Sequence, residues 1–104
     1  MQVNRGTTPT IGYRIKNIDV GDISVAYITI SQDDAVVIEK SGDDLFIDTD
    51  NRIISADLSQ ADTLKLTDKS ICQVQLRFKL NDGNTFATSV REFDVGMLLK
   101  EGEI

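Results

Sequence analysis

The fold class of this 104-residue chain is decided by one stretch, Ile71-Cys72-Gln73-Val74-Gln75-Leu76-Arg77-Phe78-Lys79-Leu80. Apolar and polar side chains alternate along it, and this period of two is typical of a β-strand with one face on a core and the other in solvent. The turn sequence Asn81-Asp82-Gly83-Asn84 follows at once. Asp-Gly between two alternating runs predicts a hairpin, because glycine readily adopts the positive φ that the turn needs.

The return strand of this hairpin, expected from Thr85, changes phase partway along. Phe86 and Val90 share one phase, whereas Phe93 and Val95 share the other. A slip of one residue near positions 91–92 predicts either a β-bulge or a strand that crosses from one sheet to the other.

Upstream of the hairpin, the same alternation and the same turn chemistry recur. The residues between the alternating runs are mainly Asp, Ser, Asn and Gly, whose side chains or backbone freedom suit turns. One stretch breaks the pattern: Ser59 is followed three residues later by Asp62, which resembles a capping box and predicts a single helical turn over 59–64. Further strands are expected at residues 11–16, 24–30, 35–39, 45–47 and 52–58.

These elements predict an all-β fold, an antiparallel two-sheet immunoglobulin-like sandwich that forms a single domain over residues 1–104. A small open β-barrel is the alternative. Residues 1–4 are expected to form a loose N-terminal arm and residues 99–104 a flexible tail. Pro9 fixes φ and lacks an N–H group, so the first strand is expected to lie at a sheet edge.

The composition argues against several classes of function. The formal net charge of −6 is unsuited to nucleic acid, whose phosphates require a basic face. No window approaches the ~18 apolar residues of a membrane span. Histidine is absent, which removes Ser-His and Cys-His nucleophilic pairs and histidine metal sites. The single cysteine, Cys72, lies on an apolar strand face and is expected to be a buried structural residue. We therefore expect no enzymatic activity and no cofactor.

Aspartates gather in the predicted turns and allow two interpretations. Calcium takes several carboxylate oxygens, so these turns are candidate calcium loops. The other interpretation, which we favour, is ordinary solvated turns. The segment from Asp48 begins like an EF-hand loop but has no glycine at the sixth position and no glutamate at the twelfth. The aspartates concerned are Asp33, Asp34, Asp43, Asp44, Asp48 and Asp50.

The C-terminal stretch is more apolar than a solvated tail requires. Met97 is expected to finish the last strand. Leu99 and Ile104 are instead expected to present a sticky edge to a partner protein.

Six segments, in order along nearly the whole chain, form a recognisable set: Arg5-Gly6-Thr7-Thr8-Pro9-Thr10, Ala26–Ile30, Val37–Lys40, Leu58–Leu66, Val74–Arg77 and Val95–Gly102. This set resembles a group of short prophage-encoded structural proteins of Gram-positive bacteria. The group is similar in outline to the immunoglobulin-like N-terminal domain of phage baseplate upper proteins, which attach receptor-binding parts to the tail.

The resemblance implies a non-enzymatic virion structural protein of a phage tail or baseplate, without a cofactor. Such a protein is made in the cytoplasm of the host bacterium and then enters the virion. Its implied partners are other tail or baseplate proteins and further copies of itself, with no nucleic acid and no membrane. Arg5, in the first matching segment, joins Leu99 and Ile104 as a candidate partner contact.

The alternative function is a carbohydrate- or cell-surface-binding module. Such a module needs exposed aromatic side chains in a groove. The two Tyr and four Phe are expected mostly on core faces, which weighs against this alternative.

Overall fold

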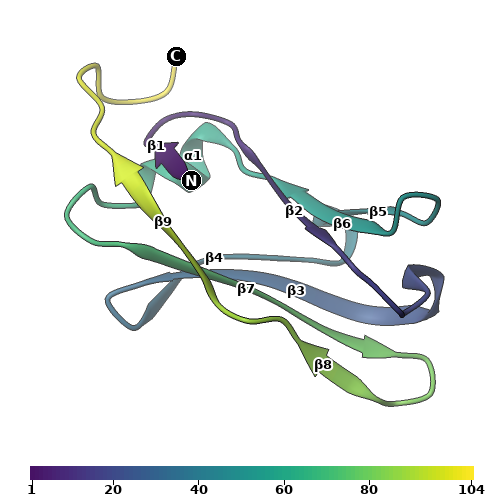
Figure 1. Cartoon of the computed structure of the whole chain (residues 1–104). Coiled ribbons are helices and arrows are strands. Elements are labelled where there is room, and N and C mark those ends of the chain that lie inside the picture. Colours follow the sequence, from purple (N-terminus) through teal and green to yellow (C-terminus); the bar gives the residue numbers. More distant parts are fainter.

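The computed structural model describes residues 1–104 and consists of two β-sheets packed face to face (Figure 1). The larger sheet has the strand order β1-β9-β7-β3-β4, with β8 also paired to β7, and the smaller sheet has the order β2-β6-β5. The two sheets do not close on each other, so the predicted sandwich is confirmed and the barrel is not formed. The strands are β1 (Gln2–Asn4), β2 (Thr10–Arg14), β3 (Ile23–Gln32), β4 (Ala35–Ser41), β5 (Leu45–Asp48), β6 (Ile53–Asp57), β7 (Cys72–Leu80), β8 (Thr85–Ala87) and β9 (Arg91–Gly96).

The strand order is that of an immunoglobulin-like sandwich, with the chain passing repeatedly between the two sheets. The short helix α1 (Gln60–Leu64) lies in the connection from β6 to β7, where the capping box predicts it. Two 3-10 turns, η1 (Val20–Asp22) and η2 (Gly42–Asp44), lie in other connections between the sheets. Strand β2 forms one edge of the smaller sheet, as Pro9 predicts.

The N-terminus is a strand, and the prediction of a loose arm over residues 1–4 is wrong. Strand β1 pairs in parallel with β9, so the sheets are not purely antiparallel, and Val3 is buried opposite Val95. The Arg5 amide also donates to the Gly96 carbonyl at 3.1 Å. Three residues are too few to display alternation, and their partner strand lies at the other end of the sequence. Nothing local in the sequence therefore marks this pairing.

The hairpin after β7 forms as predicted, and the phase slip stays within one sheet. Gly83 adopts a φ of 93°, and the Leu80 amide donates to the Asn84 carbonyl at 2.8 Å. Strands β8 and β9 both pair with β7, β8 near its end and β9 near its start. Between them, the Thr88 hydroxyl accepts from the Leu76 amide at 3.1 Å in place of a backbone carbonyl. The irregularity is thus of the bulge type and not a crossing between sheets.

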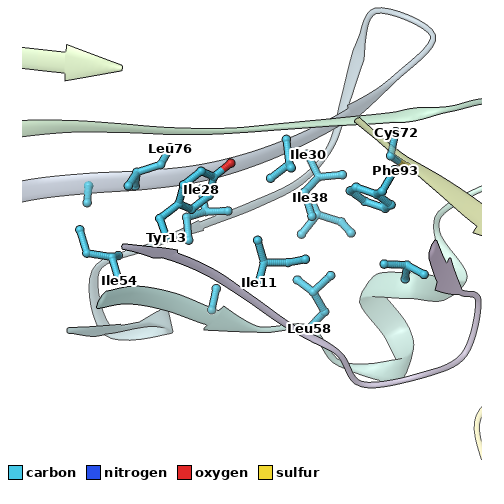
Figure 2. Packing of buried hydrophobic residues seen from close by; sticks show 14 of the residues in the cluster. Ile11, Tyr13, Ile28, Ile30, Ile38, Ile54, Leu58, Cys72, Leu76 and Phe93 are labelled. Carbon is cyan, nitrogen blue, oxygen red and sulfur yellow. The ribbon is translucent and has the colours of Figure 1, made fainter. Parts of the chain in front are cut away.

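The space between the sheets is filled by a cluster of 19 buried apolar residues, several of which are drawn in Figure 2. Both sheets contribute, with Ile11 from β2 and Ile54 from β6 opposite Ile28 from β3 and Leu76 from β7. Cys72 is fully buried in this cluster, and burial raises the pKa of its thiol to about 11. Since the thiolate is the reactive form, Cys72 is a packing residue in this fold.

One polar atom in this core lacks a protein partner. The Tyr13 hydroxyl is buried and makes no hydrogen bond. The ring itself is well placed, because the Arg91 guanidinium carbon lies 3.9 Å from the ring centroid and Arg91 donates to the Gly12 carbonyl at 3.1 Å.

Replacing Tyr13 by phenylalanine is expected to raise the free energy of unfolding by about 1 kcal/mol, because the variant no longer desolvates an unpaired hydroxyl. Urea unfolding measures the change. The control is Tyr27→Phe, whose side chain is 41% exposed and which is expected to leave stability unchanged. A clear loss of stability in Tyr13→Phe contradicts the assignment of the hydroxyl as unpaired.

Candidate interaction surface

The three residues predicted to contact a partner lie at one end of the sandwich, around α1 (Figure 1). The C-terminal segment leaves β9 after Gly96 and folds back toward the helix. The Ile104 amide donates to Gln60 Oε1 at 2.9 Å, and Gln60 Nε2 donates to the Ile104 carbonyl at 3.2 Å. The tail predicted to be flexible is thus attached to α1 at its last residue.

Three apolar side chains of the segment after β9 face solvent, whereas Leu98 is partly buried. Leu99 is 91% exposed and Ile104 is 95% exposed, so both side chains are accessible to a partner protein. Met97 is 66% exposed and lies beyond the end of β9, so the prediction that it finishes the last strand is wrong. The phase of the alternation continues to Met97, but the pairing with β1 stops at Gly96.

Arg5 binds the C-terminal end of α1. Its Nε donates to the Leu66 carbonyl at 2.8 Å and one terminal nitrogen donates to the Leu64 carbonyl at 3.2 Å. The other terminal nitrogen lies 2.6 Å from the Glu101 carboxylate. The last carbonyls of a helix lack donors within the helix, and a cation there also interacts favourably with the helix dipole. Arg5 therefore has a structural role inside the chain, where it joins the end of α1 to the C-terminal segment.

Replacing Arg5 by alanine is expected to lower the free energy of unfolding by about 2 kcal/mol, because hydrogen bonds from a charged group to two carbonyls are lost. Urea denaturation followed by circular dichroism measures the change. Glu101→Gln is the matched control, since it weakens only the exposed ion pair and is expected to cost less than about 1 kcal/mol. Equal effects of the two substitutions would contradict the capping role.

Three of the segments that carry the family resemblance meet at this end of the molecule. Gly6 has a φ of 74°, and a Cβ there would lie 2.8 Å from Cδ2 of Leu98 in the tail. The Thr63 hydroxyl donates to the Thr7 carbonyl at 2.8 Å, which joins the first segment to α1. The Leu58 amide donates to the Pro9 carbonyl at 2.9 Å. The first, fourth and last matching segments therefore form one packed unit around α1.

The helix is also connected to the larger sheet by an ion pair. The Ser59 hydroxyl accepts from the Asp62 amide at 3.0 Å, and Asp62 Oδ2 accepts from the Ser59 amide at 2.9 Å, which completes the predicted capping box. Asp62 Oδ2 also lies 2.8 Å from Lys40 Nζ on β4. Burial disfavours the Asp62 carboxylate, but the hydrogen bonds from Lys40 and Ser59 outweigh burial and hold the pKa of Asp62 below its ordinary value.

Two of the aspartates considered as calcium ligands, Asp33 and Asp48, hydrogen-bond to other groups of the protein. No three acidic or cysteine side chains are grouped so that they could hold a metal ion. Asp48 accepts from the Asn51 side chain at 2.8 Å and from its amide at 3.1 Å, and these bonds lower the pKa of Asp48. Both Asp33 oxygens lie 2.9 Å from the Ser70 hydroxyl. These carboxylates hydrogen-bond within turns and with a neighbouring loop, as Asp does in loops generally.

A second exposed surface, which was not predicted from the sequence, lies on the outer face of the larger sheet. Tyr27 is 41% exposed there, beside Val25 on β3 and opposite Arg77 on β7. Phe46 and Phe86 are also exposed, so the expectation that the aromatic residues lie mostly on core faces holds for only three of the six. The alternation along β3 places Ala26, Ile28 and Ile30 on the covered face, as their burial confirms, so Tyr27 falls on the opposite face.

No family model matches this sequence, and a comparison with curated proteins finds no match. No helix in the structure has the length and apolar character needed to cross a membrane.

Proposed function

We propose that this protein is a non-enzymatic structural component of a phage or prophage virion, a part of the tail or baseplate that acts through protein–protein contacts. The observation that carries the proposal is the exposed apolar C-terminal segment of the chain. The core is complete without it, yet Leu99 and Ile104 are held on the surface almost fully exposed. Exposed apolar patches are typical of surfaces that bind other proteins, and we infer that these two side chains contribute to such a surface.

The family resemblance supports the proposal from a different direction. Three of the matching segments build the α1 end of the sandwich, and the exposed C-terminal segment of the chain lies at this same end. The protein would be made in the host bacterial cytoplasm and then incorporated into the virion, with no role for nucleic acid or membrane. Its partners would be other tail or baseplate proteins, and a symmetric assembly would also bring copies of the chain together.

The proposal is tested on particles purified from the bacterium that carries the gene, after prophage induction. Quantitative mass spectrometry is expected to find the protein in tailed particles in a fixed ratio to other tail proteins. Leu99→Asp is expected to reduce its incorporation at least tenfold. The control is Thr49→Asp, which adds the same charge in the β5–β6 turn at the opposite end of the sandwich. Absence of the wild-type protein from the particles would overturn the proposal.

The second candidate is a carbohydrate- or cell-surface-binding module, and one observation favours it. Tyr27 borders a hollow of about 310 Å³ on the outer face, and a half-exposed tyrosine offers a stacking surface for a sugar ring. This candidate predicts glycan-array binding that Tyr27→Ala abolishes and Tyr27→Phe retains. An array without signal removes it.

A further inference from the structure

The outer face of the smaller sheet carries an apolar patch between charged residues. Phe46 on β5 points outward between the inward-packed Leu45 and Ile47, and its side chain is 71% exposed. The half-buried Ile53 on β6 lies diagonally beside it, within reach of an aromatic ring. Apolar patches rimmed by polar groups are typical of surfaces that bind proteins. We call this surface the small-sheet face, and it consists of Gly12, Arg14, Phe46, Asp48, Ile53 and Ser55.

The first row of residues across this face has a large side chain at one end and none at the other. Phe46 on β5 is paired with Ser55 on β6, and Ser55 is paired with Gly12 on β2. A Cβ atom on Gly12 would meet no atom closer than 3.8 Å, so the chain itself leaves the space above this glycine open. The ring and the open space therefore lie on either side of β6, each one strand spacing away.

The second row has a negative charge at one end and a positive charge at the other. Asp48 on β5 is paired with Ile53 on β6, and Ile53 is paired with Arg14 on β2. Arg14 is exposed, and the two ion pairs of the molecule include neither Arg14 nor Asp48. The carboxylate and the guanidinium group thus also lie on either side of β6, and neither has an oppositely charged partner within the chain.

These two rows make the small-sheet face complementary to itself. A two-fold axis that runs along β6, midway between two facing sheets, exchanges the β2 and β5 sides and keeps each position along the strands. It places Phe46 of one copy over Gly12 of the other and Asp48 of one copy over Arg14 of the other, and it repeats both contacts in reverse. Facing sheets pack about 10 Å apart, and a phenylalanine over a glycine fits this spacing.

We propose that two copies of this chain form an isologous dimer through the small-sheet face. Each Phe46 covers Gly12 of the other copy, Asp48 pairs with Arg14 on both sides, and Ile53 meets its own counterpart near the axis. The charges select a second copy as the partner, because the same face supplies the anion that Arg14 lacks and the cation that Asp48 lacks. The inference deepens the proposed function by naming the surface that joins copies, and it rests on that function only for its setting.

Sedimentation equilibrium tests the dimer. Three strands of four or five residues offer less than the ~800 Å² per partner of a standard interface, so we expect a weak dimer with a Kd of roughly 0.1–1 mM. Phe46→Ser is expected to dimerise at least tenfold more weakly. The matched control is Val36→Ser, which removes an exposed apolar side chain from the edge strand β4 of the larger sheet and is expected to change the Kd less than twofold. A wild-type protein that is monomeric at about 2 mM overturns the inference.

Gly12→Thr tests the packing without disturbing the fold. Threonine favours strands, and the space around its Cβ is open, so this variant is expected to fold normally. Its side chain occupies the space that receives Phe46 of the other copy, and dimerisation is expected to weaken at least fivefold. An unchanged Kd would contradict the placement of Phe46.

A charge exchange tests the orientation. R14E and D48K each create like-charge contacts and are expected to dimerise at least tenfold more weakly. Mixed in equal amounts, they restore attraction at both contacts of a heterodimer, whose Kd is expected within threefold of the wild-type value. The control is R77E, an equal change of charge on the larger sheet. Circular dichroism checks folding, and a mixture of folded variants that does not restore the dimer overturns the inference.

The position of the axis has a test of its own. Asp57 is exposed on β6, two residues beyond Ser55, and would face its own counterpart across this axis. Asp57→Asn removes that like-charge contact and is expected to tighten the dimer about twofold, whereas a weaker dimer would contradict this axis. All these outcomes are separate from those of the virion experiment, because a monomer can still enter the particle and a dimer can form in a protein that never does.

Discussion

Replacing Gln32 by leucine is expected to lower the free energy of unfolding by about 3 kcal/mol, the larger of the two strongest effects that the structure predicts. Gln32 ends β3 and is 5% exposed. Its Nε2 donates to the Thr67 carbonyl at 2.8 Å and to the Ser70 carbonyl at 2.9 Å, and its Oε1 accepts from the Thr67 amide at 2.9 Å. One side chain thus satisfies three backbone groups of the segment between α1 and β7.

Leucine occupies a similar volume but satisfies none of these groups. Each buried donor or acceptor without a partner costs roughly 1–3 kcal/mol, and the loop has some freedom to turn toward water, which is why we expect less than the full sum. Equilibrium unfolding in urea measures the change. Gln73→Leu is the control, because Gln73 is exposed on the outer face of β7 and such substitutions usually stay within about 0.5 kcal/mol. A loss below about 1 kcal/mol for Gln32→Leu would contradict this account.

Replacing Asp62 by alanine is expected to lower the free energy of unfolding at pH 7 by about 2–3 kcal/mol. The change removes half of the capping box, and caps contribute about 1 kcal/mol. It also leaves Lys40, whose side chain is 18% exposed, without its carboxylate. Asp68→Ala is the control, since Asp68 is exposed in the following loop and is expected to change little. Equal effects of the two substitutions would contradict the role of Asp62.

The stabilisation by Asp62 is expected to depend on pH. Because the pKa of Asp62 is lower in the folded protein than its ordinary value of 3.8, the unfolded chain binds this proton more readily. The contribution is therefore fully present above about pH 4 and is lost as the pH falls through the lowered folded pKa. The difference in stability between wild type and Asp62→Ala should shrink between pH 6 and pH 2.5. Asp48, whose pKa is also lowered, titrates in both proteins and cancels in this comparison.

The parts of the fold that local chemistry specifies were predictable from the sequence. The Asp-Gly turn places β7 and β8 next to each other, and the alternation of β7 gives its buried and exposed faces. The capping box places α1 because Ser59 and Asp62 satisfy each other's backbone amides. In each case the residues that interact are close in the sequence, so the sequence pattern itself shows which residues are in contact.

The parts that join distant segments were not predictable. Arg5 reaches Leu64, Leu66 and Glu101, and no periodicity relates these positions. Strand β1 is too short to alternate and pairs with the last strand. The exposure of Tyr27 and Phe46 depends on which face the second sheet covers and on which strand ends the sheet. The contacts at the α1 end and the hollow beside Tyr27 therefore could not be predicted from the sequence.

The parallel pairing of β1 with β9 has a mechanical consequence. Tension between the two ends of the chain would first detach the tail from Gln60 and then pull β1 and β9 in opposite directions along their common axis. The hydrogen bonds between these strands would then bear the load together, in shear, and would not open one after another like a zipper. A chain anchored at both termini would resist extension at this pair first. One of the two three-residue strands of the sandwich would then be the element on which its resistance to force depends.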